Sequence, residues 1–178
     1  MAGSITLVGM MGAGKSAVGA ELARRLGRPF LDSDTEIEAA AAMTIPEIFA
    51  RDGEAFFRDR EAEVIARLLA GPPCVLATGG GAWLRDHNRD TIRRAGLSVW
   101  LDTDVDTLWH RLRGRTGRPL LETADPRQTL HDMLAQRRPV YAAADLAVPI
   151  GIEDSIASSA DAVLHAVNRS RPDILETA

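Results

Sequence analysis

Residues 9–16 read Gly-Met-Met-Gly-Ala-Gly-Lys-Ser and fit the pattern G-x-x-x-x-G-K-S/T of a phosphate-binding loop. The glycines of such a loop let the backbone turn several N–H groups toward phosphate oxygens. Lys15 is then expected to reach the β- and γ-phosphates of a nucleotide, and Ser16 is expected to hold Mg²⁺.

The segments on both sides of this loop favour a phosphate site over a glycine-rich turn without a ligand. The apolar run Ile5–Val8 precedes the loop and has the length of a buried strand. After the loop, Val18, Leu22 and Leu26 recur at helical spacing, and Gly27 ends that pattern. This order points the positive end of a helix at the bound anion.

Two carboxyl groups stand two residues apart, at Asp32 and Asp34, after a short apolar segment. One can hold a water bound to Mg²⁺, and the other can accept or orient the proton of a substrate hydroxyl. The plainer alternative is a helix cap, for which Ser33 or Asp34 would serve. Placement one strand away from the phosphate loop favours the chemical role. Asp102 also follows an apolar run, but we assign the magnesium role to Asp32.

Phe57-Arg58-x-x-Glu61 lies on a helix predicted from about residue 54 to residue 70. Arg58 and Glu61 are three residues apart and share a face. Such a pair is usually a solvated ion pair. The functional alternative makes Arg58 a bidentate anchor for a substrate carboxylate, held in place by Glu61. Phe49 and Phe57 either form a wall of that pocket or only pack in the core.

Three further segments carry groups suited to anions. Thr78-Gly79-Gly80-Gly81 follows a predicted strand and can offer backbone N–H groups to a ligand. The arginine-rich segment 111–123 is expected to form a mobile lid whose Arg118 reaches the transferred phosphoryl group. Arg137 and Arg138 precede a proline, which disturbs the end of a helix.

Predicted strands alternate with predicted helices, which implies a parallel sheet covered by helices on both faces. We expect one α/β domain over residues 1–178, with five strands, a core from about residue 4 to 168 and a frayed tail from 169 to 178. Ligands of such sheets bind beyond the carboxyl ends of the strands. The phosphate loop, the two aspartates and the glycine run should therefore meet in one crevice.

The composition is that of an ordinary soluble globular protein, with 46% hydrophobic residues, 26% charged residues and a net charge of −4. This balance argues against a general nucleic-acid or membrane-surface binder. Cys74 is the single cysteine, which excludes an intramolecular disulfide and a cysteine zinc cluster. Because no apolar segment has membrane-helix length and the N-terminus lacks a signal-peptide pattern, we expect a cytoplasmic enzyme. We also expect the enzyme to be a monomer.

Taken together, these motifs resemble those of the shikimate kinase family. The matches run in order over roughly residues 4–150 and are Gly9-Met-Met-Gly-Ala-Gly-Lys-Ser16, Asp32-Ser-Asp34, Asp52-Gly-Glu-x-x-Phe-Arg58-x-x-Glu61, Gly79-Gly-Gly81, Arg118-Pro-Leu-Leu121 and Arg137-x-Pro-x-Tyr141. The resemblance implies a P-loop, nucleoside monophosphate kinase-like fold of three α/β/α layers with strand order 2-3-1-4-5. It also implies transfer of the γ-phosphoryl group of ATP to the 3-hydroxyl of shikimate, in chorismate and aromatic amino acid biosynthesis, with Mg²⁺ as cofactor.

The resemblance also implies roles for residues at matching positions. The implied ATP-binding residues are Gly12, Ala13, Gly14, Lys15, Ser16, Ala17, Arg111 and Arg118. A shikimate-binding region is implied at about residues 34–61. The implied shikimate-binding residues are Asp34, Arg58, Gly79, Gly80, Gly81 and Arg137. Lys15, Asp34 and Arg118 are the implied catalytic residues, with Asp34 as candidate base. Ser16 would bind Mg²⁺ directly, and Asp32 through water.

Two points stay open in this assignment. Arg138 stands beside Arg137 and is a second candidate for the arginine that binds the substrate carboxylate. The family often has a basic residue after the last strand that contacts adenine, whereas segment 151–154 is acidic here.

Rival functions are less well matched. A GTPase switch would need Asn-Lys-x-Asp and Asp-x-x-Gly, and neither pattern occurs in the sequence. A second rival is another small-molecule kinase, for gluconate or a nucleotide. Two arginines beside a triple glycine favour a carboxylated polyol over a nucleobase. A non-catalytic ATP-binding scaffold would not need Lys15, Ser16 and Asp34 together.

Overall fold

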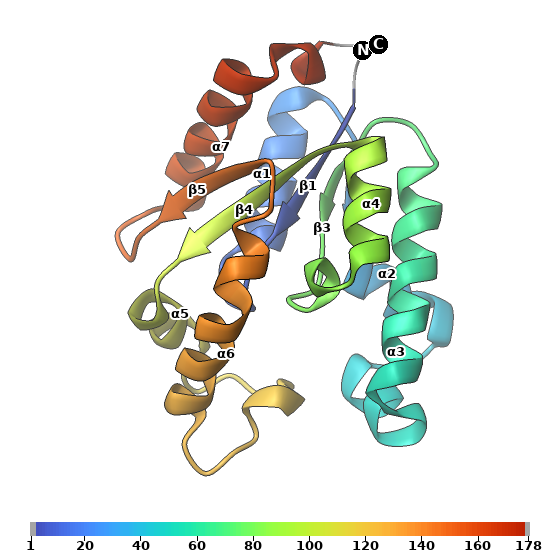
Figure 1. Ribbon diagram of the computed structural model, residues 1–178, viewed down its shortest axis with the longest axis vertical. Coiled ribbons are helices and arrows are strands. Elements are labelled where there is room, and N and C mark those ends of the chain that lie inside the picture. The colour runs from blue at the N-terminus through green and yellow to red at the C-terminus, as the bar shows by residue number, and fades with distance from the viewer. Residues whose placement is uncertain (1–2, 177–178) are drawn as a thin grey trace.

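The five strands in the described part of the chain form one parallel sheet, as the sequence predicts (Figure 1). The computed structural model describes residues 3–176, the side chain of Pro119 aside. The strand order is β2-β3-β1-β4-β5, and every neighbouring pair is parallel. The strands are β1 (Ser4–Val8), β2 (Phe30–Asp32), β3 (Val75–Ala77), β4 (Gly96–Thr103) and β5 (Leu146–Ile150). β1 and β3 are buried along their whole length, as expected of strands covered on both faces.

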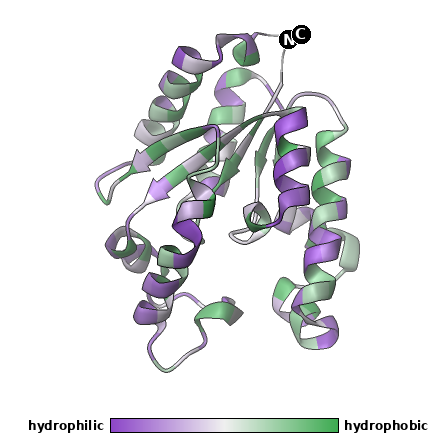
Figure 2. Cartoon of the chain, in the orientation of Figure 1, coloured by the Kyte–Doolittle hydropathy of each residue, from purple (hydrophilic) through white to green (hydrophobic). Residues whose placement is uncertain are grey.

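Helices cover both faces of this sheet. α1 packs beside α7 behind it, while α4 lies in front with α3 at its side (Figure 1). Figure 2 shows hydrophilic residues over the visible side of α4, whereas its Ile92 is fully buried. The helices are α1 (Lys15–Leu26), α2 (Ser33–Ala41), α3 (Ile45–Leu69), α4 (Asp86–Ala95), α5 (Val105–Leu112), α6 (Pro126–Tyr141) and α7 (Ile156–Ser170). None of the helices in the described part of the chain is long and apolar enough to cross a membrane.

α2 and α3 enclose a second, smaller core. Its buried members are Ile37 of α2 and Ile48 and Phe57 of α3. α3 is interrupted at Gly53, whose φ of 85° and ψ of 170° are not helical. The sequence predicts that a helix begins at about residue 54, just after this glycine. The second part of α3 packs beside α4, and it brings Arg58 to the carboxyl end of the sheet.

The predicted frayed tail is wrong over residues 169–176. α7 continues to Ser170, a 3-10 turn follows at Pro172–Leu175, and Ile174 is buried. The guanidinium of Arg28 donates hydrogen bonds to the carbonyl oxygens of Gly3, Ile174 and Glu176. One apolar side chain and one arginine therefore hold this segment, a long-range contact that local sequence does not reveal. Residues 177–178 lie outside the described range.

Replacing Arg28 with alanine should loosen this C-terminal segment. The substitution removes the donor from two partly buried carbonyl oxygens and one exposed one, so the free energy of unfolding should fall by about 1–3 kcal/mol. Hydrogen exchange at residues 172–176 should become faster, whereas steady-state turnover at 25 °C should not change. Arg24→Ala, which removes an exposed ion pair on α1, is the matched control and should leave this exchange unchanged. Unaltered exchange in Arg28→Ala would show that Arg28 does not hold the segment.

Candidate functional site

The phosphate loop joins β1 to α1 at the carboxyl end of the central strand. Gly14 precedes the first turn of α1 with φ 93° and ψ 19°, a left-handed conformation that favours glycine. A Cβ atom on Gly12 would lie 2.8 Å from Cγ of Leu112, so the loop packs closely against α5. The first turn of α1 holds no acidic residue, which leaves its positive end available to an anion.

Lys15 is the only lysine of the chain, and its ammonium group lies inside the loop. Its Nζ donates to the carbonyl oxygens of Gly9 at 2.7 Å and Met10 at 2.8 Å. Burial lowers the pKa of Lys15 to about 8, although the carboxylates of Asp34 and Asp32 favour the charged form. A phosphate oxygen that enters the loop therefore strongly stabilises the charged form of Lys15.

Ser16 and Asp32 form a pair of oxygen donors at the mouth of the loop. Ser16 Oγ donates to Asp32 Oδ2 at 2.5 Å. Asp32 Oδ1 accepts from the N–H groups of Asp34 at 3.0 Å and Thr35 at 3.3 Å, so Asp32 caps α2. The predicted caps, Ser33 or Asp34, are wrong. A cap at Asp32 leaves the side chain of Asp34 to the cleft.

The donor chemistry of this pair fits Mg²⁺. A hydroxyl and a carboxylate are hard oxygen ligands, and Mg²⁺ in kinases keeps several waters and substrate phosphates in its shell. No group of three or more His, Cys, Asp or Glu side chains within residues 3–176 is placed to hold a metal ion. Any Mg²⁺ held at Ser16 and Asp32 would therefore take most of its ligands from water and phosphate.

Three buried polar atoms face the cleft without a partner. Asp34 Oδ1, Glu61 Oε2 and Arg137 Nη1 make no hydrogen bond within the described part of the chain. Burial raises the pKa of Asp34, and the Asp32 carboxylate adds to the rise. Burial also raises the pKa of Glu61, against the effect of Arg58. Buried polar groups are normally satisfied, so this arrangement indicates a polar ligand.

The glycine run after β3 allows these side chains to approach. A Cβ atom on Gly79 would lie 2.8 Å from Asp34 Oδ1 and 2.9 Å from Glu61 Oε2. Arg58 Nη1 donates to Glu61 Oε1 at 2.9 Å, which is the pairing expected from the sequence. A Cβ atom on Gly81 would collide with the Arg58 guanidinium. Arg58 therefore reaches from α3 onto the backbone of the glycine run.

All these groups line one cleft of about 1020 Å³. The predicted site residues that line it are Gly12, Gly14, Lys15, Ser16, Ala17, Asp32, Asp34, Arg58, Gly79, Gly80, Gly81, Arg111, Arg118 and Arg137. Phe49 and Phe57 line it as well, with their ring centroids 4.9 Å apart. Ala13 does not line it, because its side chain is fully buried.

The predicted lid borders the cleft, but its first two residues belong to α5. Arg111 Nη1 donates to the carbonyl oxygens of Gly12 at 3.3 Å and Ala13 at 3.2 Å, which fastens α5 to the phosphate loop. The loop proper begins at Arg113. Arg118 lines both the cleft and a second cavity of about 240 Å³.

The acidic segment 151–154 contributes Asp154 to the wall of the cleft. Both carboxylate oxygens of Asp154 already accept hydrogen bonds, one from the segment and one from α7. Oδ2 accepts from the N–H of Gly151 at 2.7 Å, and Oδ1 accepts from Ser158 Oγ at 3.1 Å. The carboxylate therefore shapes this wall and has already filled much of its capacity to accept hydrogen bonds.

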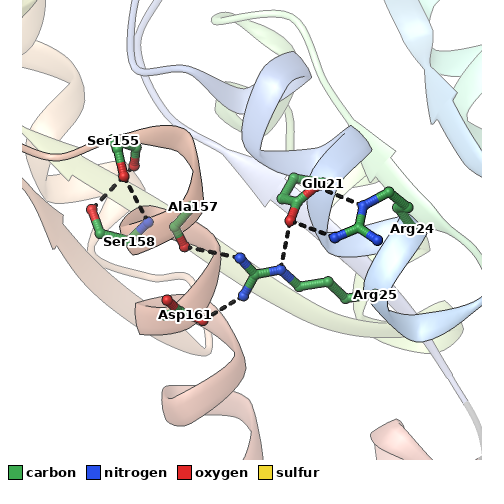
Figure 3. Close-up of polar contacts among 7 residues, drawn as sticks. All are labelled: Glu21, Arg24, Arg25, Ser155, Ala157, Ser158 and Asp161. Atoms are coloured by element: carbon green, nitrogen blue, oxygen red, sulfur yellow. Dashed lines mark hydrogen bonds and ion pairs between the residues drawn. The ribbon is translucent and has the colours of Figure 1, made fainter.

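A contact between α1 and α7 keeps this wall in place (Figure 3). Arg25 of α1 donates to Glu21 at 2.7 Å, to the carbonyl oxygen of Ala157 at 3.4 Å and to Asp161. Ser155 caps the first turn of α7. α1, which follows the phosphate loop, thus holds the start of α7, which follows segment 151–154.

Comparison with known proteins agrees with this geometry. A sequence profile described as shikimate kinase matches residues 11–168. The shikimate kinase of Cereibacter sphaeroides is 59% identical over 174 residues, covering 98% of this chain and 86% of that protein. The chain belongs to the shikimate kinase family. The shikimate kinase of Ruegeria pomeroyi is also 59% identical, over 97% of this chain and 88% of that protein.

The family also accounts for the fold. The structure of shikimate kinase from Acinetobacter baumannii in complex with shikimate matches with a TM-score of 0.87 at 39% identity. The match covers 99% of this chain and 97% of that chain. The expected kinase-like α/β/α architecture with strand order 2-3-1-4-5 is therefore confirmed.

Sequence reasoning gave no role to Tyr141, although it belongs to a motif shared with shikimate kinases. The side chain is fully buried, and its hydroxyl donates to the carbonyl oxygen of Gly80. The available signal was spacing, because Arg137 and Tyr141 are four residues apart and share one face of α6. Asp102 was set aside as a metal ligand, and it pairs instead with Arg138.

ATP binding should be coupled to proton uptake above pH 8. The pKa of Lys15 is about 8, and contact with phosphate oxygens favours the ammonium form and raises that pKa. At about pH 8.5 the complex should therefore take up roughly half a proton or more. Calorimetric titration with ATP in two buffers of different ionisation enthalpy measures this number.

Lys15→Arg is the matched control, because arginine stays charged and should abolish the uptake. At about pH 7 the parent protein should show much less lysine-linked uptake, since Lys15 is then mostly charged before ATP binds. Equal proton numbers for the parent and Lys15→Arg at about pH 8.5 would contradict the assignment of a buried, phosphate-facing Lys15.

Proposed function

We propose that this chain is a shikimate kinase that transfers the γ-phosphoryl group of ATP to the 3-hydroxyl of shikimate. The products are shikimate 3-phosphate and ADP, in chorismate and aromatic amino acid biosynthesis. The single observation that carries the proposal is the shared cleft, in which a phosphate loop faces Asp34, Arg58 and Arg137 over a glycine run.

ATP binds at the phosphate-loop end of this cleft. The backbone N–H groups of residues 12–17 and the start of α1 receive its phosphates, and Lys15 reaches the β- and γ-phosphates. In this proposal Arg118 of the lid approaches the transferred group, and Arg111 stacks on the adenine. The hydrogen bonds of Arg111 to Gly12 and Ala13 support this placement, because they hold its guanidinium beside the loop.

Ser16 and Asp32 hold Mg²⁺ in this proposal, Ser16 directly and Asp32 through water. Their oxygen donors, 2.5 Å apart at the loop mouth, support that assignment. Mg²⁺, when bound, neutralises charge on the phosphate oxygens.

Shikimate binds at the other end of the cleft. It carries a carboxylate and vicinal hydroxyl groups, and Arg58 and Arg137 bind the carboxylate by charge-assisted hydrogen bonds. The substrate can approach the backbone closely at Gly79, Gly80 and Gly81, because these residues carry no side chain. The unpaired Nη1 of Arg137 and Oδ1 of Asp34 support this fit, since one needs an acceptor and the other can accept a hydroxyl proton.

The chemistry follows from this placement. The 3-hydroxyl oxygen attacks the γ-phosphorus, the bond from that phosphorus to the bridging oxygen breaks, and ADP leaves. Asp34 accepts the hydroxyl proton, and its raised pKa makes it a better proton acceptor than an exposed aspartate. Lys15 and Arg118 neutralise the charge that develops on the phosphoryl oxygens.

Two variants should separate chemistry from acceptor binding. Asp34→Asn keeps the size of the side chain but cannot take the proton, so kcat should fall by about a hundredfold or more while ATP affinity is unchanged. Arg58→Ala loses a charged hydrogen bond worth about 1.5–3 kcal/mol, so shikimate affinity should fall about ten- to a hundredfold. Calorimetry with each ligand and a coupled assay of ADP release measure both effects.

The same assay tests the acceptor itself. The parent protein should release ADP with shikimate, and not with gluconate or nucleoside monophosphates. Turnover on the acid side should fall as Asp34 becomes protonated, at a pH above the ordinary aspartate range because its pKa is raised. Gluconate turnover equal to that with shikimate, or parental kcat in Asp34→Asn, would refute the proposed acceptor chemistry.

A further inference from the structure

The last turns of α6 carry Arg137 but are weakened from within. Pro139 lies inside the helix. Proline has no N–H to donate, and its ring crowds the carbonyl group four residues earlier. The backbone that positions Arg137 therefore depends on contacts from outside the helix.

One such contact comes from the end of β4. Arg138 donates from Nη1 and Nη2 to Oδ1 and Oδ2 of Asp102, both at 2.9 Å, in a bidentate arrangement. The same guanidinium lies 5.0 Å above the ring of Trp100. Arg138 does not line the cleft, whereas Arg137 does. The two adjacent arginines therefore face different surroundings.

A second contact joins this helix end to the glycine run. Tyr141 is fully buried, stacks on Trp100 with ring centroids 5.9 Å apart, and donates its hydroxyl to the carbonyl oxygen of Gly80. Trp83 Nε1, just beyond the glycine run, donates to the carbonyl oxygen of Val140 at 2.9 Å. Trp100 thus packs against both Arg138 and Tyr141.

We propose that Asp102, Arg138 and Tyr141 are positioning residues that fix Arg137 and Gly80 relative to one another. A Cβ atom on Gly80 would lie 3.6 Å from Arg137 Nη1, so these two groups are already side by side. The inference rests on the proposed binding of a carboxylated acceptor by Arg137. Asp102 and Arg138 act on that acceptor only through the helix backbone and Trp100.

The test uses Arg138→Met, Arg138→Lys and Asp102→Asn in the full chain. Arg138→Met and Asp102→Asn should each raise KM and Kd for shikimate about three- to fivefold, the upper part of the range expected for losing a well-formed but partly exposed ion pair. KM for ATP and kcat should stay within about twofold. Arg138→Lys keeps the positive charge over Trp100 but loses the two parallel donors of the guanidinium, so it should retain part of the shikimate affinity that Arg138→Met loses.

Additivity and a remote pair provide the controls. The double variant Asp102→Asn/Arg138→Met should be no worse than either single variant, because both act through one contact. Arg171→Met breaks another bidentate pair, in which Nε and Nη2 each donate to one oxygen of Asp173 at 2.8 Å, and it should leave shikimate KM unchanged. Thermal unfolding of each variant identifies loss of folded protein. An equal loss of ATP and shikimate affinity would overturn the inference, because it would mark a merely structural role.

Arg137→Ala separates this inference from the function on which it rests. If Arg137→Ala weakens shikimate binding and the Asp102 and Arg138 variants do not, the positioning role is wrong and the proposed site stands. If Arg137→Ala binds shikimate as the parent does, the proposed carboxylate site is wrong, and the inference is overturned with it. Weakening by Arg137→Ala and by both positioning variants supports the two together.

Discussion

The close approach of two carboxyl groups to Gly79 is the constraint around which the cleft is arranged. Asp34 Oδ1 and Glu61 Oε2 both face the position where any other residue would carry Cβ. Glu61 is fully buried, and a buried carboxylate costs several kcal/mol, on the order of the stability of a small domain, unless a cation pairs with it. Arg58 supplies that cation on one oxygen and leaves the other unpaired. The cleft therefore retains polar groups whose natural partners belong to a ligand.

The rest of the fold brings cations to this place in a chain whose net charge is −4. The phosphate loop, the turn at Asp32 and the glycine run each follow the carboxyl end of a parallel strand, so they meet at one edge of the sheet. This proximity explains why Lys15 and Asp34 influence each other's pKa. Arg58 arrives on α3 beyond the break at Gly53, next to Phe57 of the small core. Arg137 arrives on a helix end that Arg138 and Tyr141 hold from two sides. Arginine supplies every cation except Lys15, whose flexible stem suits a phosphate that arrives from the solvent.

Local sequence patterns predicted the features that depend on residues close together in the chain. Buried runs predicted the strands, glycine spacing predicted the phosphate loop, and the three-residue separation of Arg58 and Glu61 predicted their contact. Such patterns failed where a contact joins distant parts of the chain. The burial of Ile174 and the reach of Arg28 to Gly3 overturned the frayed tail. Asp32 rather than Ser33 or Asp34 caps α2, because the choice among adjacent polar residues depends on where β2 ends. Arg137 and Arg138 look alike in sequence, and only Asp102, far away in the chain, separates their surroundings.

The most direct test of this account is the affinity of Gly79→Ala for shikimate, measured by calorimetry beside its affinity for ATP. Gly79 has no positive φ, so the backbone accepts alanine, and only the new Cβ atom, 2.8 Å from Asp34 Oδ1, disturbs the site. Gly71→Ala, whose Cβ atom would meet only the Leu68 carbonyl oxygen at 3.4 Å, is the matched control. We predict that Gly79→Ala loses at least about tenfold in shikimate affinity and keeps its ATP affinity, by the arithmetic of one lost charged hydrogen bond. A folded Gly79→Ala protein that binds shikimate as tightly as Gly71→Ala would contradict the central claim.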